Sequence, residues 1–109
     1  MNDRELLELA ARAAGVGRNR WDYDEMRRLG HMVTRRMMWN PLADNSDALW
    51  LLAKLRIDIQ HLDTGLVAAH RRTRYSPSAV ETYGEDECAA TRRAITRAAA
   101  EIGKNMGAA

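Results

Sequence analysis

The sequence predicts an α+β fold in which three helices pack on a small antiparallel sheet. Two observations lead to this prediction. Three segments, at about 3–14, 46–55 and 87–102, repeat their apolar residues every three or four positions, as one buried face of an α-helix does. Between the second and the third of them, apolar and polar residues alternate, which is the pattern of strands with one buried face. The predicted strands cover about 30–39, 56–62, 66–74 and 79–83.

Length and composition predict one soluble domain. The chain has 109 residues, of which 46% are hydrophobic and 29% are charged, as in ordinary globular proteins. We expect a single domain over 1–109, with 104–109 as a flexible tail. No apolar run approaches the roughly 18 residues that span a bilayer, so no membrane partner is expected. Acidic residues near the N-terminus, where a signal peptide would be basic, predict a protein that stays in the cytoplasm.

The first helix is predicted from its ends as well as from its periodicity. Asn2 or Asp3 can accept the free amide hydrogens of the first turn, and Gly15 can take the left-handed conformation that stops a helix. The expected buried face consists of Leu6, Leu9, Ala10 and Ala13.

The segment that follows has a weaker pattern. A helix could open at Asp22 or Asp24, but Gly30 interrupts it. The residues then alternate, although neither side of the strand would be purely apolar. We interpret the segment as a turn of helix or a loop to about 28, followed by a strand at 30–39. Proline at 41 ends that strand, because it has no amide hydrogen to donate.

The stretch "ADNSD" offers several N-caps for the second helix. Its polar residues could instead hold a divalent ion, but a calcium loop alternates its ligands over about twelve residues, and here the acids stop after four. We therefore interpret the cluster Asp44, Asn45, Ser46 and Asp47 as helix capping. The expected inner face of this helix is Leu49, Leu52 and Ala53, with Trp50 and Lys54 toward the edge.

Alternation returns after the second helix. "RIDIQHL" places Ile57 and Ile59 on one side, "DTG" at 63–65 is typical of a hairpin turn, and "LVAAHRRTRY" would be the return strand. "SPS" ends it before a third strand, "AVETY". The last helix would begin at the cap Asp86 and stop at Gly103. Its expected inner stripe is Cys88, Thr91, Ile95, Ala98 and Ile102, and Arg97 is expected to pair with Glu101.

Few residues could carry catalysis or bind a metal. Cys88 is the only cysteine, so an intrachain disulfide and a thiolate-rich metal site are excluded, and we expect its side chain to be buried. His61 and His70 could face each other across the hairpin and hold a metal with Asp63, but such a pair more often only lies on a sheet. His31 stands apart, there is no glycine-rich phosphate loop, and no serine has a nucleophile-elbow context. We expect no enzyme activity, no metal and no cofactor.

Arginine is the main candidate for recognition. The net charge is +2, and all but two of the 17 basic residues are arginine, often in pairs. Such pairs could recognise phosphate or carboxylate, or could reflect genome composition. In the strand "HRRTRY" they could bind an acidic protein surface or nucleic acid, or simply protect a sheet edge. The predicted partner-binding residues are Arg71, Arg72, Arg74 and Tyr75, with Arg35, Arg36 and Met38 as a second patch.

The segment 21–39 is rich in methionine and tryptophan, which are enriched at partner-binding surfaces. In a chain without phenylalanine these residues could instead supply the core. A homodimer would satisfy both interpretations.

Two blocks of the chain are "WNPLADNSDALWLLAKLRI" and "AATRRAITRAAAEIGKNM", and the chain opens with "NDRELLELAARAAG". The two blocks, and also the opening, resemble small phage and prophage proteins related to the NinX family, a domain of unknown function. The matching positions are Trp39, Asn40, Pro41, Leu42, Asp47, Ala48, Leu49, Lys54, Leu55, Ala90, Thr91, Arg92, Arg93, Ala94, Ile95 and Ala100. The resemblance covers about half of the chain and brings no catalytic residues with it.

The resemblance implies a phage gene that is expressed in the bacterial host cytoplasm and has an accessory role outside the virion. Many such proteins disable host machinery, as anti-CRISPR proteins do. We therefore expect a non-enzymatic protein that binds a host protein or ribonucleoprotein complex, in particular a defence complex, and inhibits it by occupancy. The alternative is a small nucleic-acid-binding or regulatory module that uses the same arginines.

Overall fold

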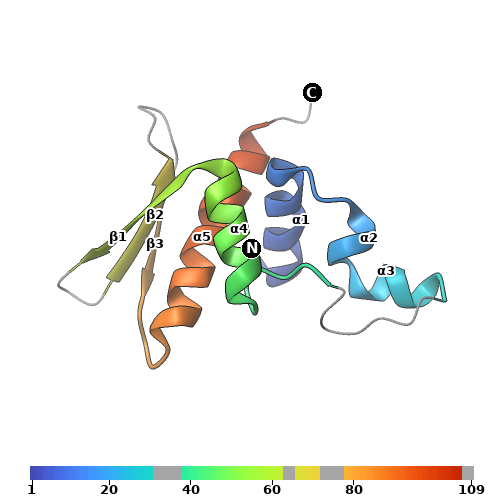
Figure 1. The fold of residues 1–109 in the computed structure, drawn as a ribbon, viewed down its shortest axis with the longest axis horizontal. Coiled ribbons are helices and arrows are strands. Elements are labelled where there is room, and N and C mark those ends of the chain that lie inside the picture. Colours follow the sequence, from blue (N-terminus) through green and yellow to red (C-terminus); the bar gives the residue numbers. More distant parts are fainter. Residues whose placement is uncertain (31–37, 63–65, 72–77, 107–109) are drawn as a thin grey trace.

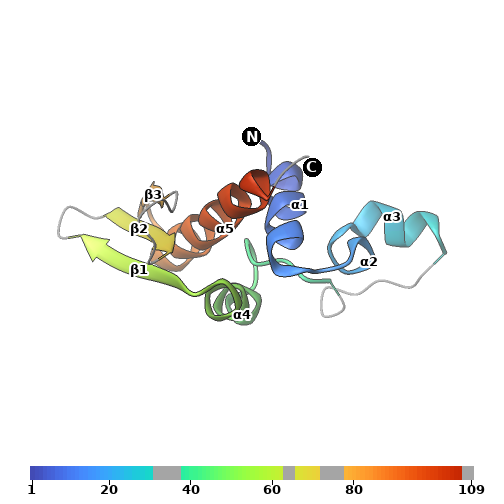
Figure 2. The same ribbon diagram turned by 90° about the horizontal axis from the view of Figure 1, so that it is seen from above.

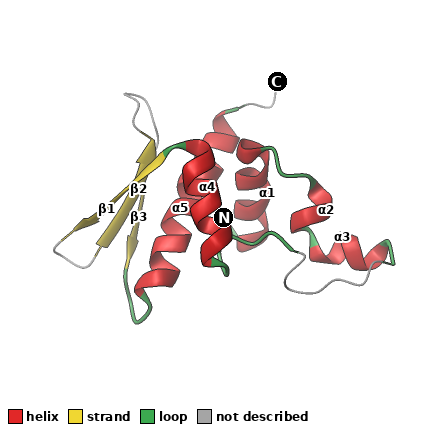
Figure 3. Ribbon diagram, in the orientation of Figure 1, coloured by secondary structure: helices red, strands yellow, loops and turns green. Residues whose placement is uncertain are grey.

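The computed structural model describes residues 1–30, 38–62, 66–71 and 78–106 (Figure 1). The helices are α1 (Asp3–Ala14), α2 (Arg18–Trp21), α3 (Tyr23–Arg28), α4 (Asn45–Leu55) and α5 (Glu87–Asn105). The strands are β1 (Ile57–Leu62), β2 (Leu66–Arg71) and β3 (Ser78–Thr82). The predicted mixture of helices and strands is confirmed. The finer prediction, three helices on a four-stranded sheet, is not confirmed, because two short helices follow α1 (Figure 3).

Helix α5 lies at the centre of the molecule, between the sheet and α1, and α4 packs against it (Figure 1). Helices α2 and α3 lie on the far side of α1 from the sheet, as both views show (Figure 2). The molecule therefore consists of a central helical layer with the sheet at one end and the α2–α3 unit at the other. The chain returns from α3 to the central layer through residues 38–44.

The contact between α1 and α5 is built from small residues. Ala10, Ala11 and Ala14 of α1 are buried, as are Ala94 and Ala98 among other alanines of α5. Small side chains let two helices approach closely, and they give this core its main contact. The predicted face of α1 was partly wrong, because Leu9 and Ala13 are only half-buried while Ala11 and Ala14 lie inside.

Caps at the helix ends follow the sequence closely. The side chains of Asn2, Asp44 and Asp86 each accept a hydrogen bond from the backbone amide three residues later. Gly15 ends α1 with φ 75°. Gly103, in contrast, does not stop α5, which continues to Asn105. The predicted tail therefore begins too early, since 104 and 105 are helical and 107–109 lie outside the described residues.

The buried stripe of α5 differs from the predicted one. Ile95, Ala98 and Ile102 are buried as expected, but Cys88 is exposed and Thr91 is only half-buried. Cys88 lies in the first turn, before α5 enters the contact with α1 and the sheet, so nothing there covers the thiol. Arg97 does not pair with Glu101 in the structure; its Nη1 lies 2.8 Å from Glu81 Oε1 of the sheet.

Helix α4 buries a different face from the one that the sequence predicts. Ala48, Leu51 and Leu55 lie in the core, and Leu52 is half-buried. Leu49 is 65% exposed, and Ala53 is exposed too. The periodicity could not decide, because "ALWLLA" is apolar all the way round the helix. The small Ala48 side chain allows α4 to approach the rest of the core, and this contact selects the stripe.

The sheet is antiparallel, in the order β1-β2-β3. Ile57 and Ala79 are buried, whereas Val80 is 48% exposed on the other face, which no described helix covers (Figure 2). The predicted strand at 30–39 falls mostly on 31–37, outside the described residues, and Gly30 and Met38 at its ends are not in a strand. The turn at 63–65 and the predicted strand end at 72–74 also lie outside the described residues.

Candidate functional site

Most of the predicted partner-binding residues lie outside the part of the chain that the structure describes. This applies to Arg35, Arg36, Arg72, Arg74 and Tyr75. Arg71 is the last residue of β2, at the register position opposite Ile57. Met38 is half-buried and is the one predicted residue with a described environment. The predicted arginine row therefore stays a prediction, and the surroundings of Met38 define the candidate site.

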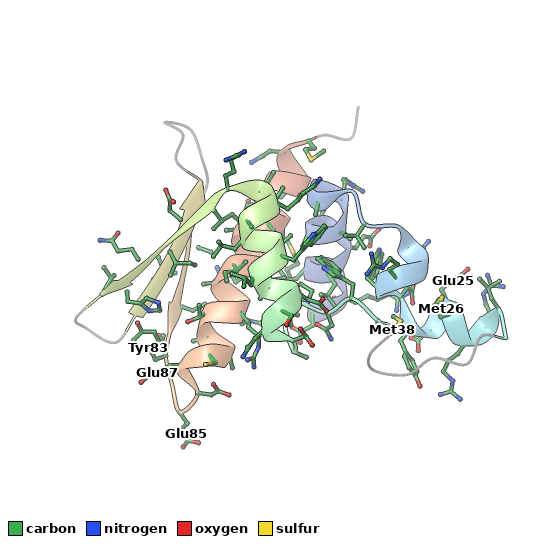
Figure 4. All side chains as sticks on the ribbon, viewed as in Figure 1. Glu25, Met26, Met38, Tyr83, Glu85 and Glu87 are labelled. Atoms are coloured by element: carbon green, nitrogen blue, oxygen red, sulfur yellow. The ribbon has the colours of Figure 1, made fainter. Side chains whose placement is uncertain are left out.

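Met38 lines a cleft of about 790 Å³ between α1, the start of α3 and the returning segment 38–44. Figure 4 places Met38 beside the α2–α3 unit. Apolar walls are formed by Leu7, Trp21, Tyr23, Met38, Trp39 and Ala43, and polar groups by Arg4, Asp22, Asp24, Asn40 and Asp44. The cleft thus joins aromatic and methionine surface to several carboxylates.

A buried carboxylate, that of Asp22, holds the α2–α3 unit against α1. Its Oδ2 lies 2.7 Å from Arg4 Nη2 and 3.3 Å from Arg18 Nε. Its Oδ1 accepts a hydrogen bond of 3.1 Å from the backbone amide of Glu25, which makes it the N-cap of α3. A buried charge needs such partners, because burial without them is strongly unfavourable. From the sequence, Asp22 is only one of two possible helix starts.

Trp39 joins the returning segment to α2 and α4. Its backbone amide donates to the carbonyl of Arg20 over 2.6 Å, and its ring meets that of Trp50 edge to face, with centroids 6.3 Å apart. Its indole Nε1 is buried and has no hydrogen-bond partner among the described residues. A buried donor left without an acceptor costs about 1–3 kcal/mol. Most buried polar groups in native structures have a partner, so this donor calls for an explanation.

The polar cluster at 44–47 has a structural role. Asp44 Oδ1 accepts the amide of Asp47, and Asp47 Oδ2 accepts the amide of Asn40 over 2.8 Å. Arg92 of α5 donates to the carbonyl of Leu42 and to Asn45 Oδ1, over 2.9 and 2.7 Å. The capping interpretation is confirmed, and the cluster fixes one wall of the cleft. No group of three or more His, Cys, Asp or Glu suited to a metal ion occurs in the described residues.

The two histidines of the hairpin do not form a pair. His61 lies opposite Val67 in the register and His70 opposite Asp58, so the two occupy opposite faces of the sheet. His61 instead stacks on Tyr83, with ring centroids 5.7 Å apart, and its Nδ1 is hydrogen-bonded to the tyrosine hydroxyl. Asp63, the third ligand of the metal alternative, lies outside the described residues.

Exposed apolar side chains gather near the cleft. Tyr23 is 45% exposed on α3, and Leu49 and Trp50 are 65% and 43% exposed on the outer side of α4. Trp39 connects the two, since it lines the cleft and touches Trp50. We call Tyr23, Met38, Leu49 and Trp50, together with the buried Trp39 that connects them, the aromatic surface. The sequence signalled it through the methionines and aromatics of 21–39, but could not add α4, because Leu49 was assigned to the core.

The chain matches no known protein family, no curated protein and no solved structure in these comparisons. Among the residues that the structure describes, no helix has both the length and the apolar character needed to cross a membrane.

Proposed function

We propose that the protein acts by binding another protein through the aromatic surface, without catalysis. In this proposal it is a phage or prophage accessory protein that occupies a macromolecular complex of the bacterial host, such as a defence complex, and inhibits it. The exposed apolar side chains of α4 support binding to another protein. The phage context of the proposal rests on the resemblance of the helical blocks to NinX-like phage proteins alone.

The main observation behind the proposal is the exposure of apolar side chains on α4. Leu49 and Trp50 are more than two-fifths exposed, although Ala48 and Leu51 on the same helix are fully buried in the core. Covering such apolar area contributes roughly 25 cal/mol for each Å² removed from water. Trp, Tyr and Met are also enriched at protein interfaces, and all three contribute to the aromatic surface. A protein partner would therefore gain the most binding free energy by covering these exposed side chains of α4.

The acidic residues of the region support binding more than catalysis. Asp22 is committed to two arginines and a helix cap, and Asp44 and Asp47 are committed to backbone amides. A general acid or base must instead have its carboxyl free to reach a substrate proton. These carboxylates have the surroundings of structural groups.

The alternative, a nucleic-acid-binding module, depends on Arg71, Arg72 and Arg74. It predicts affinity for random DNA that falls steeply with salt, because phosphate contacts release counterions. The triple alanine variant would lose this affinity. Binding through the aromatic surface does not require these arginines or this dependence on salt. The same set of variants therefore distinguishes the two functions.

The test is affinity purification of tagged protein from lysate of the native host, with nuclease treatment and mass spectrometry. We expect a protein complex to stay bound to the wild type and to be lost at least tenfold from Leu49→Glu, as for a central interface residue. Val80→Glu is the matched control, because it places the same charge on an exposed apolar residue of the sheet. A complex that survives Leu49→Glu, or none at all, would contradict the proposed function. Loss on nuclease treatment would favour the alternative.

A further inference from the structure

We propose that the cleft receives a basic side chain of the partner, an arginine or lysine within an apolar segment. This inference rests on the proposed function and specifies the chemistry of the partner. The inference concerns the cleft, whereas the proposed function depends chiefly on α4. An experiment can therefore disprove the inference about the cleft without disproving the proposed function, and the reverse.

The charges that line the cleft point to a cation. They belong to one arginine and three aspartates, a formal charge of −2 in a chain whose net charge is +2. The charge of Asp22 is neutralised by Arg4 and by Arg18. Arg18 is not among the residues that line the cleft. Among the described residues, Asp24 has only the longer contact of 3.4 Å with Arg4, and its side chain is 83% exposed. A cation in the cleft would therefore find an accessible carboxylate, that of Asp24.

The apolar walls fit the stem of a long basic side chain. Leu7 and Met38 offer aliphatic and thioether surface, along which the methylene groups of arginine or lysine can pack. Aromatic rings of the α2–α3 unit already attract guanidinium groups. Arg18 lies 5.8 Å from the centroid of Trp21, and Arg27 lies 5.7 Å from that of Tyr23. Tyr23 is still 45% exposed, so its ring can take part in a further cation–π contact.

The indole of Trp39 is a second, independent indication of a peptide ligand. Trp39 lines the cleft, and its buried Nε1 has no acceptor among the described residues. The backbone of a bound peptide supplies carbonyl oxygens, which are the acceptors that this donor lacks. Because Nε1 is closed to solvent in the free protein, this hydrogen bond forms only if the indole rotates toward the cleft on binding. A change at the Trp39 indole N–H is therefore a specific mark of the proposed complex.

The test uses the full-length protein and three synthetic peptides, Ac-Ala-Leu-Xaa-Leu-Ala-NH₂, in which Xaa is arginine, citrulline or glutamate. Citrulline has the shape of arginine without its charge. Binding is followed by ¹⁵N NMR of the three indole N–H resonances, which are assigned through single Trp→Phe variants. We expect the arginine peptide to shift the resonances of Trp39 and Trp21 at millimolar concentration. The citrulline peptide should bind about fivefold more weakly, and the glutamate peptide should cause no shift.

Two single-residue variants test whether the arginine peptide binds in the cleft. Asp24→Asn should weaken the arginine peptide about threefold to fivefold, because it removes the accessible carboxylate. Glu85→Gln is the control, since this exposed residue lies in the turn before α5, outside the cleft lining. Both variants keep the buried Asp22 cluster, so both should fold like the wild type. Light scattering of the free protein is recorded in parallel; a dimer that Asp24→Asn dissociates would assign the cleft to a second copy and overturn the proposal.

Three other results would overturn it: no resonance shift with the arginine peptide, equal affinity for citrulline and arginine, or stronger binding of glutamate. These outcomes are independent of the proposed function. If the wild type retains a host complex that Leu49→Glu loses, but the arginine peptide does not bind, only the cleft inference fails. If the peptide binds as expected and no complex is retained, the proposed function fails and the chemistry of the cleft stands.

Discussion

Gly103 of α5 lies against the backbone of Leu9 in α1. A Cβ atom on Gly103 would lie 1.9 Å from the carbonyl oxygen of Leu9 and 2.8 Å from its carbonyl carbon. Both neighbouring atoms are backbone, so no side-chain rotation can relieve the contact. Gly103 is thus not the helix stop that its sequence position predicts. It is a residue at which α1 and α5 approach each other closely.

Gly103→Ala is therefore expected to destabilise the protein, although alanine favours helices by about 1 kcal/mol over glycine. Overpacking against backbone should outweigh that gain and leave a net loss of about 2 kcal/mol. Urea unfolding measures the difference. Asn105→Ala, at an exposed position of the same helix, is the control and should be neutral or slightly stabilising. If Gly103→Ala were also stabilising, the close approach of α1 and α5 would be wrong.

Asp22→Ala should loosen the α2–α3 unit. The substitution removes the N-cap of α3 and the common partner of Arg4 and Arg18, which we expect to cost about 1–3 kcal/mol. Asp22→Asn keeps an acceptor for the cap and should lose less. Hydrogen exchange reports the effect, because protection of the amides in α3 should fall while that of α5 changes little.

A comparison with Asp24→Ala separates the buried carboxylate from an exposed one. Within the part of the chain that the structure describes, Asp24 has one long contact, with Arg4, and its side chain is 83% exposed. Its loss should therefore change stability by less than about 0.5 kcal/mol. Equal effects of the two alanine variants would show that burial of Asp22 is not what holds α2 and α3 in place.

How much the sequence could predict depended on the kind of signal. Helix caps are local: Asp86 has the predicted role, and Asn2 and Asp44 are among the candidates that the sequence offers for the other two caps. The buried faces were less predictable, because α4 is apolar on all sides and only its packing partners choose between Leu49 and Leu51. Gly103 shows the same limit. Glycine is typical both of a helix stop and of a close helix contact, and only tertiary structure distinguishes them.

The candidate site was even harder to predict, because it joins distant segments. Arg4, Asp22 and Asp44 come from three elements, and no spacing in the sequence relates them. The aromatic and methionine-rich composition of 21–39 indicates a partner surface, and Met38 of this segment lines the cleft. The predicted arginines lie chiefly outside the described residues, so their role stays a prediction.

Trp39→Phe should be far better tolerated than Trp39→Ala. Phenylalanine keeps an aromatic ring beside Trp50 and removes the indole donor that has no described acceptor. Removal of an unsatisfied donor offsets part of the lost packing, so we expect a change within about 1 kcal/mol. Alanine leaves a cavity and should cost about 3–5 kcal/mol. Thermal unfolding measures both; a phenylalanine variant as unstable as the alanine variant would mean that Nε1 has a partner in the native state.

The contact of Glu25 with Arg28 makes the stability of α3 depend on pH in the acidic range. Its hydrogen bond from Arg28 lowers the pKa of the Glu25 carboxyl from its ordinary value of 4.5. A lowered pKa means that the interaction is complete above about pH 4.5 and is lost as the pH falls through the lower, folded value. NMR titration of the Glu25 side chain should therefore show a midpoint below 4.5. In Arg28→Gln the midpoint should return toward 4.5, and an unchanged midpoint would exclude Arg28 as the cause.

Leu49 and Leu51 of α4 offer a direct test of which face meets the core. Leu51 is fully buried, so Leu51→Ala should cost about 2–5 kcal/mol in urea unfolding. Leu49 is 65% exposed, and Leu49→Ala should change stability by less than about 0.5 kcal/mol.

If Leu49→Ala were instead destabilising, measurement of the unfolding free energy at several protein concentrations would identify the reason. A loss that disappears at low protein concentration would place Leu49 in a homodimer, because the stability of a dimer depends on concentration. A loss independent of concentration would return Leu49 to the core, as the sequence predicted, and would remove the support that α4 gives to a partner-binding surface.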